Sequence, residues 1–249
     1  MVNRSYSTVT RMRAEIPTSP RISGILFDFG GTLDGDGLHW LDRFYQLYAS
    51  SDLPLARSQI RAAFDFAEAR ALEDPAMQNA PLEEMVRRHV HCQFAHLSID
   101  DRSLEEQIAT QFTADVRVVA NRNRALLEEL AQNDLRLGVI SNGCGNTAEL
   151  CDELGFSPYL AVVLDSKLVG LSKPDPQFFV RAAQELGLTP DRVLMVGDSL
   201  VRDIQPAKQI GMQTAWLIAD RTATHPAADY RISVLPEMRA VLTPLAPLE

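Results

Sequence analysis

GILFDFGGTLDGDG, residues 24–37, is the stretch that decides the fold. It belongs to an apolar run that begins at residue 22 and closes at Asp28, just before a pair of glycines. This order is typical of a strand that is buried in a parallel sheet and ends in a turn. Similar runs follow much later in the chain, at residues 135–142, 161–166, 192–198 and 214–219, with a candidate sixth at 230–235.

Helical patterns separate these later runs, because apolar residues recur at helical spacing within residues 146–154, 178–186 and 204–210. Strands that alternate with helices indicate βαβ units, so we expect an α/β fold with a Rossmann-like parallel sheet. Such a sheet carries its site at the carboxyl ends of its strands. Three of the predicted strands end in polar residues, which should therefore lie at one edge: Asp28, Ser141–Asn142 and Asp198.

Residues 38–120 have a different pattern. Apolar residues recur there at helical spacing in four successive segments, and no strand is predicted. We therefore expect an all-helical cap domain of residues 38–120, inserted into an α/β core domain of residues 21–37 and 121–249. Residues 1–20 are polar and lack a sustained apolar face, so a disordered tail is predicted there.

Composition narrows the function classes. The chain of 249 residues has a formal net charge of −9 and no cluster of Lys and Arg, which argues against nucleic acid or an anionic membrane as a partner. No apolar run approaches the ~20 residues that span a bilayer. Three cysteines without CxxC spacing argue against a disulfide framework, and we expect a cytoplasmic protein.

Four short motifs follow one another along the chain: DFGGT at 28–32, SNG at 141–143, SKPDP at 172–176 and GDSLVRD at 197–203. Each falls at a predicted strand end or in the loop that follows. In this order they resemble the haloacid dehalogenase superfamily, and the resemblance covers residues 22–220. The helical insert between the first and second motifs is similar to the family's helical caps of the first type.

The resemblance implies a role for each matching residue. Asp28 would attack phosphorus and form an aspartyl-phosphate that water then hydrolyses, and Lys173 would neutralise the nucleophile and the phosphate. The residues expected to bind the phosphoryl oxygens are Thr32, Ser141, Asn142 and Lys173. The expected substrate is a small phosphorylated metabolite, and the sequence leaves the oligomeric state open.

A Mg²⁺ site follows from the same resemblance. The carboxylates of Asp28 and Asp198 and the backbone carbonyl of Gly30 would bind the ion, and Asp203 would support the ion or its waters. A carboxylate that attacks a phosphate dianion faces like-charge repulsion, which a divalent cation and a lysine offset. Mg²⁺ also prefers oxygen ligands in an octahedron.

Gly30 departs from the family pattern. In the superfamily's phosphatases an Asp at this position protonates the leaving oxygen and then deprotonates water, help that is worth about 10²–10⁴-fold. Three explanations stay open. Another acid takes over, with Asp34, Asp36, His39 or a cap residue as candidates; the substrate has a good leaving group, such as an acyl phosphate; or the aspartyl-phosphate is long-lived and passes its phosphoryl group to an acceptor other than water.

Two alternatives from other classes also stay open. One is a 2-haloacid dehalogenase, since those relatives lack the second Asp too, although they need no Mg²⁺ and a retained GDS…D motif implies a metal. The other is a catalytically silent binding protein with the same fold. The phosphonate-cleaving relatives are excluded, because they need a cap lysine and residues 38–120 contain none.

The cap carries further polar residues. His89, His91, Cys92 and His96 do not have the spacing of a structural zinc site, so we interpret them as surface or interface residues. Five cap arginines are candidates for binding an anionic substrate: Arg57, Arg61, Arg70, Arg87 and Arg88.

Overall fold

The computed structural model describes residues 21–51, 53–220 and 222–242, so the predicted tail, residues 1–20, lies outside the described residues. Within them, six parallel strands form one sheet in the order β3-β2-β1-β4-β5-β6. The strands are β1 (Gly24–Phe27), β2 (Arg136–Ser141), β3 (Leu160–Asp165), β4 (Val193–Gly197), β5 (Gln213–Leu217) and β6 (Tyr230–Ile232). The predicted α/β fold class and its parallel sheet are confirmed.

Successive residues of the central strands face opposite sides of the sheet. On one side, Phe27 and Val196 belong to an apolar cluster that continues into the helical insert. On the other side, Leu26 and Met195 belong to a second cluster with helix residues such as Phe178. Both faces of the sheet are therefore covered, which explains why its strands read as continuous apolar runs.

Helices make up most of the remaining described structure. The core carries α5 (Thr147–Glu153), α6 (Ser166–Val169), α7 (Pro176–Glu185), α8 (Gln205–Gln209) and α9 (Met238–Leu242). Short helical turns join several elements: η1 (Phe29–Leu33), η2 (Pro75–Met77), η3 (Ser157–Tyr159), η4 (Pro190–Arg192), η5 (Leu200–Ile204) and η6 (Leu235–Glu237). In the described ranges no helix combines the length and the apolar character that crossing a membrane requires.

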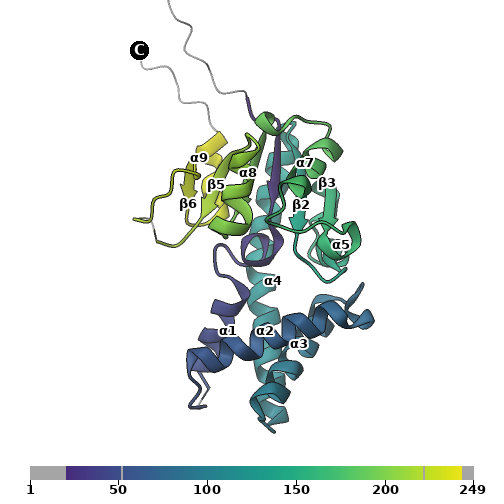
Figure 1. The fold of residues 1–249 in the computed structure, drawn as a ribbon, viewed down its shortest axis with the longest axis vertical. Helices are drawn as coiled ribbons and strands as arrows, with labels where there is room; N and C mark the ends of the chain where they lie inside the picture. Colours follow the sequence, from purple (N-terminus) through teal and green to yellow (C-terminus); the bar gives the residue numbers. More distant parts are fainter. Residues whose placement is uncertain (1–20, 52, 221, 243–249) are drawn as a thin grey trace, which may run out of the picture.

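The insert consists of α1 (Trp40–Ala49), α2 (Arg57–Glu73), α3 (Leu82–Leu97) and α4 (Arg102–Gln132), which lie between β1 and β2 in the chain. Figure 1 shows the sheet at one end of the molecule and α1–α3 at the other, with α4 extending from one part into the other. The predicted boundary at residue 120 falls inside α4. The division into a core of 21–37 and 121–249 and a cap of 38–120 therefore stays a proposal.

Two aspartates begin helices that position the site. The side chain of Asp101 accepts a hydrogen bond from the Leu104 N–H at 3.0 Å and so caps α4. Asp175 caps α7 in the same way, at 2.9 Å from the Gln177 N–H, and Pro176 occupies the first helical position. The cap at Asp175 fixes the end of the loop that carries the SKPDP motif.

Candidate active site

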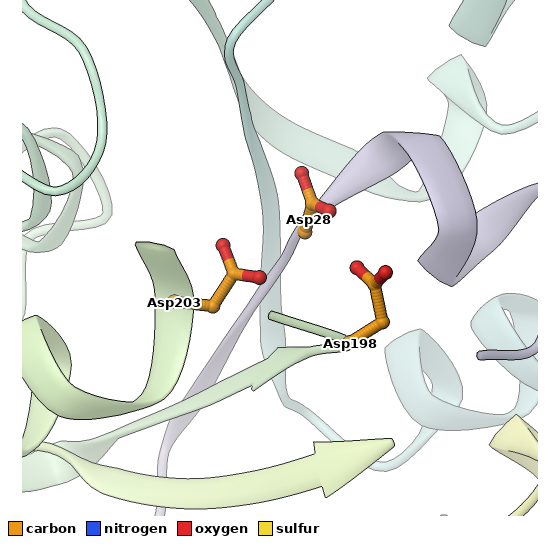
Figure 2. Close-up of side chains that lie close together, drawn as sticks. All are labelled: Asp28, Asp198 and Asp203. Atoms are coloured by element: carbon orange, nitrogen blue, oxygen red, sulfur yellow. The ribbon is translucent and has the colours of Figure 1, made fainter. Parts of the chain in front are cut away.

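Three carboxylates meet at the carboxyl edge of the sheet. Asp28 directly follows β1, Asp198 directly follows β4, and Asp203 lies in turn η5. One oxygen of each carboxylate lies within 4.8 Å of the others, and Figure 2 shows the three side chains gathered beside the ends of these strands. β1 has β2 on one side and β4 on the other, so the strand order changes direction at β1. Ligands of open α/β sheets bind at such topological switch points.

Lys173 reaches this cluster from the loop before α7. Its Nζ donates hydrogen bonds to the carboxylate of Asp28 and, at 2.7 Å, to that of Asp203. Burial alone would lower the pKa of Lys173, but the two carboxylates outweigh that effect, and the pKa is raised. The ammonium is therefore charged at neutral pH and neutralises part of the cluster.

Asn142 joins the Lys173 loop to the end of β2. Its amide nitrogen donates to the Lys173 carbonyl at 2.8 Å, and its amide oxygen accepts from the Lys173 N–H at 2.8 Å. The sequence predicts a phosphate ligand here, but both polar groups of this side chain are engaged by backbone. The contacts make Asn142 a positioning residue for Lys173, and its role as a phosphate ligand stays a prediction, since the amide nitrogen has a second hydrogen.

Negative charge accumulates among the three carboxylates. The pKa of Asp198 is raised well above its usual range, because the carboxyl is buried and faces Asp28 and Asp203. Burial also raises the pKa of Asp203, to about 6, although Lys173 opposes this. Three carboxylates against one ammonium leave an excess of negative charge that a cation would neutralise. Since carboxylate oxygens are the ligands that Mg²⁺ prefers, the donor set fits a hard divalent cation.

The conformation of turn η1 requires glycine at one of its two glycine positions. Gly31 has φ +87°, and a Cβ at this position would lie 2.8 Å from Oδ2 of Asp198, so the turn requires glycine at position 31. Gly30 has φ −73°, and the nearest atom to an added Cβ, Nε1 of Trp40, would be 3.8 Å away. The turn therefore does not require glycine at position 30, and the missing carboxylate there is a chemical difference from the family pattern.

The remaining residue of the first motif is also in the cluster. Thr32 is fully buried, and its Oγ1 donates to Oδ1 of Asp198 at 3.4 Å. The hydroxyl thus orients a carboxylate of the cluster in this structure.

Asp34 and Asp36, two candidates for the missing acid, are held by other groups. Asp34 is fully buried; it accepts from the indole N–H of Trp40 at 2.5 Å and from the Gly31 N–H at 2.6 Å. Burial raises the pKa of Asp34 to about 6. Asp36 is bonded to Arg122 and, at 3.0 Å, to the Asn123 amide. Neither aspartate borders the cavity described next.

A cavity separates the carboxylate cluster from the helices of the insert. On the core side it is bordered by Asp28, Gly30, Ser141 and Lys173. The opposite wall is mainly apolar, with Trp40, Phe64, Ala71, Leu72, Met77 and Met85. The structure thus brings together the predicted nucleophile, the predicted lysine and Ser141 at a space that has room for a small organic group.

Glu68 and His89 are polar side chains in the insert wall of this cavity. The Gln93 amide nitrogen lies 2.8 Å from Nδ1 of His89, and Nε2 of His89 lies 3.0 Å from Oε1 of Glu68. Since the amide donates to Nδ1, Nε2 carries the hydrogen and donates to Glu68. Burial by itself would raise the pKa of Glu68, but the bond from His89 and nearby positive charge outweigh it, and the pKa is lowered.

His39, the third acid candidate, does border the cavity, together with Arg202 of turn η5. Its Nδ1 accepts from the Leu41 N–H at 3.2 Å and so caps α1, while its Nε2 lies 3.0 Å from a guanidinium nitrogen of Arg202. Burial lowers the pKa of His39 most, and the charge of Arg202 lowers it further.

The cap arginines do not have the predicted role in this structure. Among the described residues that border the cavity there is no arginine of the insert, and Arg202 comes from the core. Arg57, Arg70, Arg87 and Arg88 instead form ion pairs with acidic residues on the surface of the insert.

The cavity residues that sequence reasoning missed include Trp40, Glu68 and Arg202. Glu68 lies in α2, where helical periodicity does not reveal which charged residue faces the core. A signal did exist for Arg202, because it directly precedes Asp203 in the fourth motif.

Comparison with known proteins places the chain among hydrolases. Its strongest curated similarities include a glyceraldehyde 3-phosphate phosphatase of Methanocaldococcus jannaschii, 34% identical over 116 residues, which are 45% of this chain and 51% of that enzyme. An N-acetylmuramic acid 6-phosphate phosphatase of Pseudomonas aeruginosa is 28% identical over 78% of this chain and 81% of that enzyme. The chain thus spans about half the length of the first relative.

A solved structure shares the fold. An L-2-haloacid dehalogenase from Xanthobacter autotrophicus, with chloropropionic acid covalently bound, matches with a TM-score of 0.55 at 18% identity, over 90% of this chain and 100% of that chain. A likeness at this identity shows the fold and not the activity. The family model for haloacid dehalogenase-like hydrolases matches residues 22–211. The chain belongs to the haloacid dehalogenase-like hydrolase family.

Proposed function

We propose that the protein is a Mg²⁺-dependent phosphatase that hydrolyses a small phosphomonoester through an aspartyl-phosphate on Asp28. The observation that carries this proposal is the ion pair between Asp28 and Lys173 inside a cluster of three carboxylates that opens onto the cavity. The curated relatives support it, since the two described above are named as phosphatases. We also propose a cytoplasmic location.

The residues that would hold the metal are Asp28, Asp198 and Asp203, with the carbonyl of Gly30 as the predicted backbone ligand. Their fit rests on the excess negative charge of the cluster and on the raised pKa of Asp198. A bound divalent cation would supply positive charge against the phosphoryl oxygens and the attacking carboxylate.

The first step forms a bond from a carboxylate oxygen of Asp28 to phosphorus and breaks the bond from phosphorus to the leaving oxygen. The charge of Lys173 lowers the repulsion between the carboxylate and the phosphate dianion. The Ser141 hydroxyl, at the end of β2 and on the border of the cavity, would donate to a phosphoryl oxygen. In the second step water attacks phosphorus, which releases inorganic phosphate and restores the carboxylate of Asp28.

The proton that the leaving oxygen needs has no donor at Gly30. Asp34 and Asp36 are engaged elsewhere and do not border the cavity, whereas His39 does. We therefore expect a turnover slower than that of relatives with a second Asp, and a preference for leaving groups that need little protonation.

The test is release of inorganic phosphate from a panel of phosphomonoesters, acyl phosphates and nucleotides, with Mg²⁺ and with a chelator. Wild type is compared with Asp28→Asn, which keeps the size of the side chain but removes the nucleophile. Release that needs both Mg²⁺ and Asp28 supports the proposal. The absence of release, together with halide release from a 2-haloacid without metal, would replace it with the dehalogenase. A chain that catalyses neither reaction would be a silent binding protein.

A further inference from the structure

We propose that His39 and Arg202 form an anion-binding clamp in the active cavity, which binds a second anionic group of the substrate. This inference rests on the proposed function and narrows its substrate class to phosphomonoesters that carry a further oxyanion, such as a carboxylate. Both side chains border the same cavity as Asp28 and Lys173.

The first observation concerns Arg202. Arg202 is exposed, and within the described residues no carboxylate lies within ion-pair distance of its guanidinium, one nitrogen of which lies 3.0 Å from Nε2 of His39. Several arginines on the surface of the insert are paired, and Arg87, for example, lies 3.0 Å from Glu83, whereas Arg61 has no carboxylate within ion-pair distance among the described residues. Lys173, the other cation that borders the cavity, is already bonded to Asp28 and Asp203. Arg202 therefore brings positive charge to the cavity without a carboxylate at ion-pair distance among the described residues, although its charge contributes to the lowered pKa of Glu68.

The second observation concerns the hydrogen bonds of His39. A neutral imidazole has one donor nitrogen and one acceptor nitrogen. Because Nδ1 accepts from the Leu41 N–H, Nε2 carries the hydrogen and points at the guanidinium of Arg202, which has only donors. In the opposite tautomer Nδ1 carries the hydrogen, and it then faces the Leu41 N–H, which is also a donor. An oxyanion beside the imidazole and the guanidinium would accept from both and remove the conflict between donors.

The position of the clamp fits a bifunctional substrate. A Cβ added to Gly31 would lie 3.2 Å from Cα of His39, and Arg202 directly precedes Asp203, so both residues flank the loops that carry the carboxylate cluster. The lowered pKa of His39 agrees with a neutral imidazole that faces a positive charge. An anion with planar oxygens suits the fork geometry of arginine.

Glu68 argues for a different charge on the substrate. It borders the same cavity and is ionised, so it would favour a substrate with an ammonium group rather than an anion. We place the substrate charge at Arg202 because Glu68 already accepts a hydrogen bond from His89, whereas Arg202 has no carboxylate partner among the described residues.

The test uses three phosphomonoesters with the same two-carbon chain that differ at the far end: phosphoglycolate with a carboxylate, ethyl phosphate with a methyl group and phosphoethanolamine with an ammonium group. Binding is measured by calorimetry on Asp28→Asn in the presence of Mg²⁺, so the result does not depend on turnover. We expect phosphoglycolate to bind at least tenfold more tightly than ethyl phosphate, because hydrogen bonds to charged groups are each worth about ten- to a hundredfold. Equal binding, or a preference for phosphoethanolamine, would overturn the proposal.

Variants at Arg202 identify the group responsible. Arg202→Gln should remove most of the preference for phosphoglycolate over ethyl phosphate, and Arg202→Lys should restore part of it. The matched control is Arg181→Gln, which removes an exposed arginine of α7 that pairs with Glu185 at 2.9 Å and does not border the cavity, and which should leave the preference unchanged. If Arg202→Gln keeps the full preference, the clamp is wrong. If phosphoglycolate binds through Arg202 but wild type releases no phosphate from any ester, the clamp stands and the proposed phosphatase function fails.

Discussion

Single residues around Asp28 determine the charge of the candidate active site. The carboxylate is held by one ammonium, that of Lys173, and it shares its surroundings with Asp198 and Asp203. The ammonium offsets part of the negative charge at Asp28, while the other two carboxylates create the need for a cation. At Gly30 the chain lacks the second carboxylate that the family's phosphatases have.

Gly30→Asp tests the effect of this missing carboxylate. The backbone at position 30 has φ −73° and an added Cβ has only ordinary contacts, so the variant should fold. We expect phosphate release to rise at least tenfold, since general acid–base help contributes about 10²–10⁴-fold. The control is Gly30→Asn, which adds a side chain of similar size that transfers no proton. Steady-state release no faster than wild type would mean that another residue already supplies the proton.

Asp34 makes the stability of the fold depend on pH. Its pKa is raised from 3.8 to about 6, so the folded state favours the protonated carboxyl. Stability from this group is full below pH 4, is lost as the pH rises towards 6, and is constant above that; the total loss is ~3 kcal/mol at most. Asn does not titrate, so the unfolding free energy of wild type should fall relative to Asp34→Asn across this window. Urea unfolding at several pH values measures the difference, and a difference that does not change with pH would refute the assignment.

Among the elements, the loop before α7 depends most on one contact. Asn142 makes two hydrogen bonds to the backbone of Lys173. Its side chain thereby links this loop directly to the end of β2. A loop that shifts by a fraction of an ångström moves the ammonium away from Asp28.

Asn142→Ala should therefore lower kcat about tenfold or more, since misplacement of a catalytic group is costly. It should also reduce stability by about 1–2 kcal/mol, because two partly buried hydrogen bonds are lost. Asn142→Asp is the matched comparison: its carboxylate can accept from the Lys173 N–H but cannot donate to the carbonyl. Kinetics and thermal unfolding of both variants provide the readout. An Asn142→Ala variant with raised KM and unchanged kcat would point to a phosphate ligand instead.

The elements also show what the sequence can predict. All six strands could be located because each is an apolar run between turn or helix signals, and the carboxylate cluster followed from polar residues at their ends. The four helical segments of the insert are expected within residues 38–120, whereas α4 continues to Gln132, and residues 102–132 contain no Gly or Pro to stop a helix. The cavity wall could not be predicted, because Glu68 and Trp40 reach it only through the way in which the insert packs on the core.

At the scale of the whole molecule, the insert and the core together enclose the site. The core supplies the carboxylates and Lys173, and the insert supplies the apolar wall with Glu68 and His89. Figure 1 shows α4 extending from one part into the other, and the segment between η1 and α1 also joins them. The substrate's leaving group is expected to contact the insert, while its phosphoryl group contacts the core.

Metal binding should stabilise the whole fold. A cation present at 100 times its Kd adds about 2.7 kcal/mol, which corresponds to a rise in Tm of roughly 5–10 °C for a chain of this size. Asp198→Asn should lose most of this rise. Without a cation the same variant should be more stable than wild type at pH 7, because the raised pKa of Asp198 means that its ionised form is disfavoured in the fold. Equal Tm shifts with Mg²⁺ in both proteins would place the metal elsewhere.

The most direct test of the central claim is the mass of the peptide that contains Asp28, measured after acid quenching during turnover of a phosphomonoester with Mg²⁺. We predict that a fraction of wild-type protein carries one phosphoryl group on Asp28, and that the fraction falls in Gly30→Asp because water then attacks faster. Asp28→Asn should carry none and release no phosphate. Phosphate release by Asp28→Asn at the wild-type rate would contradict the account.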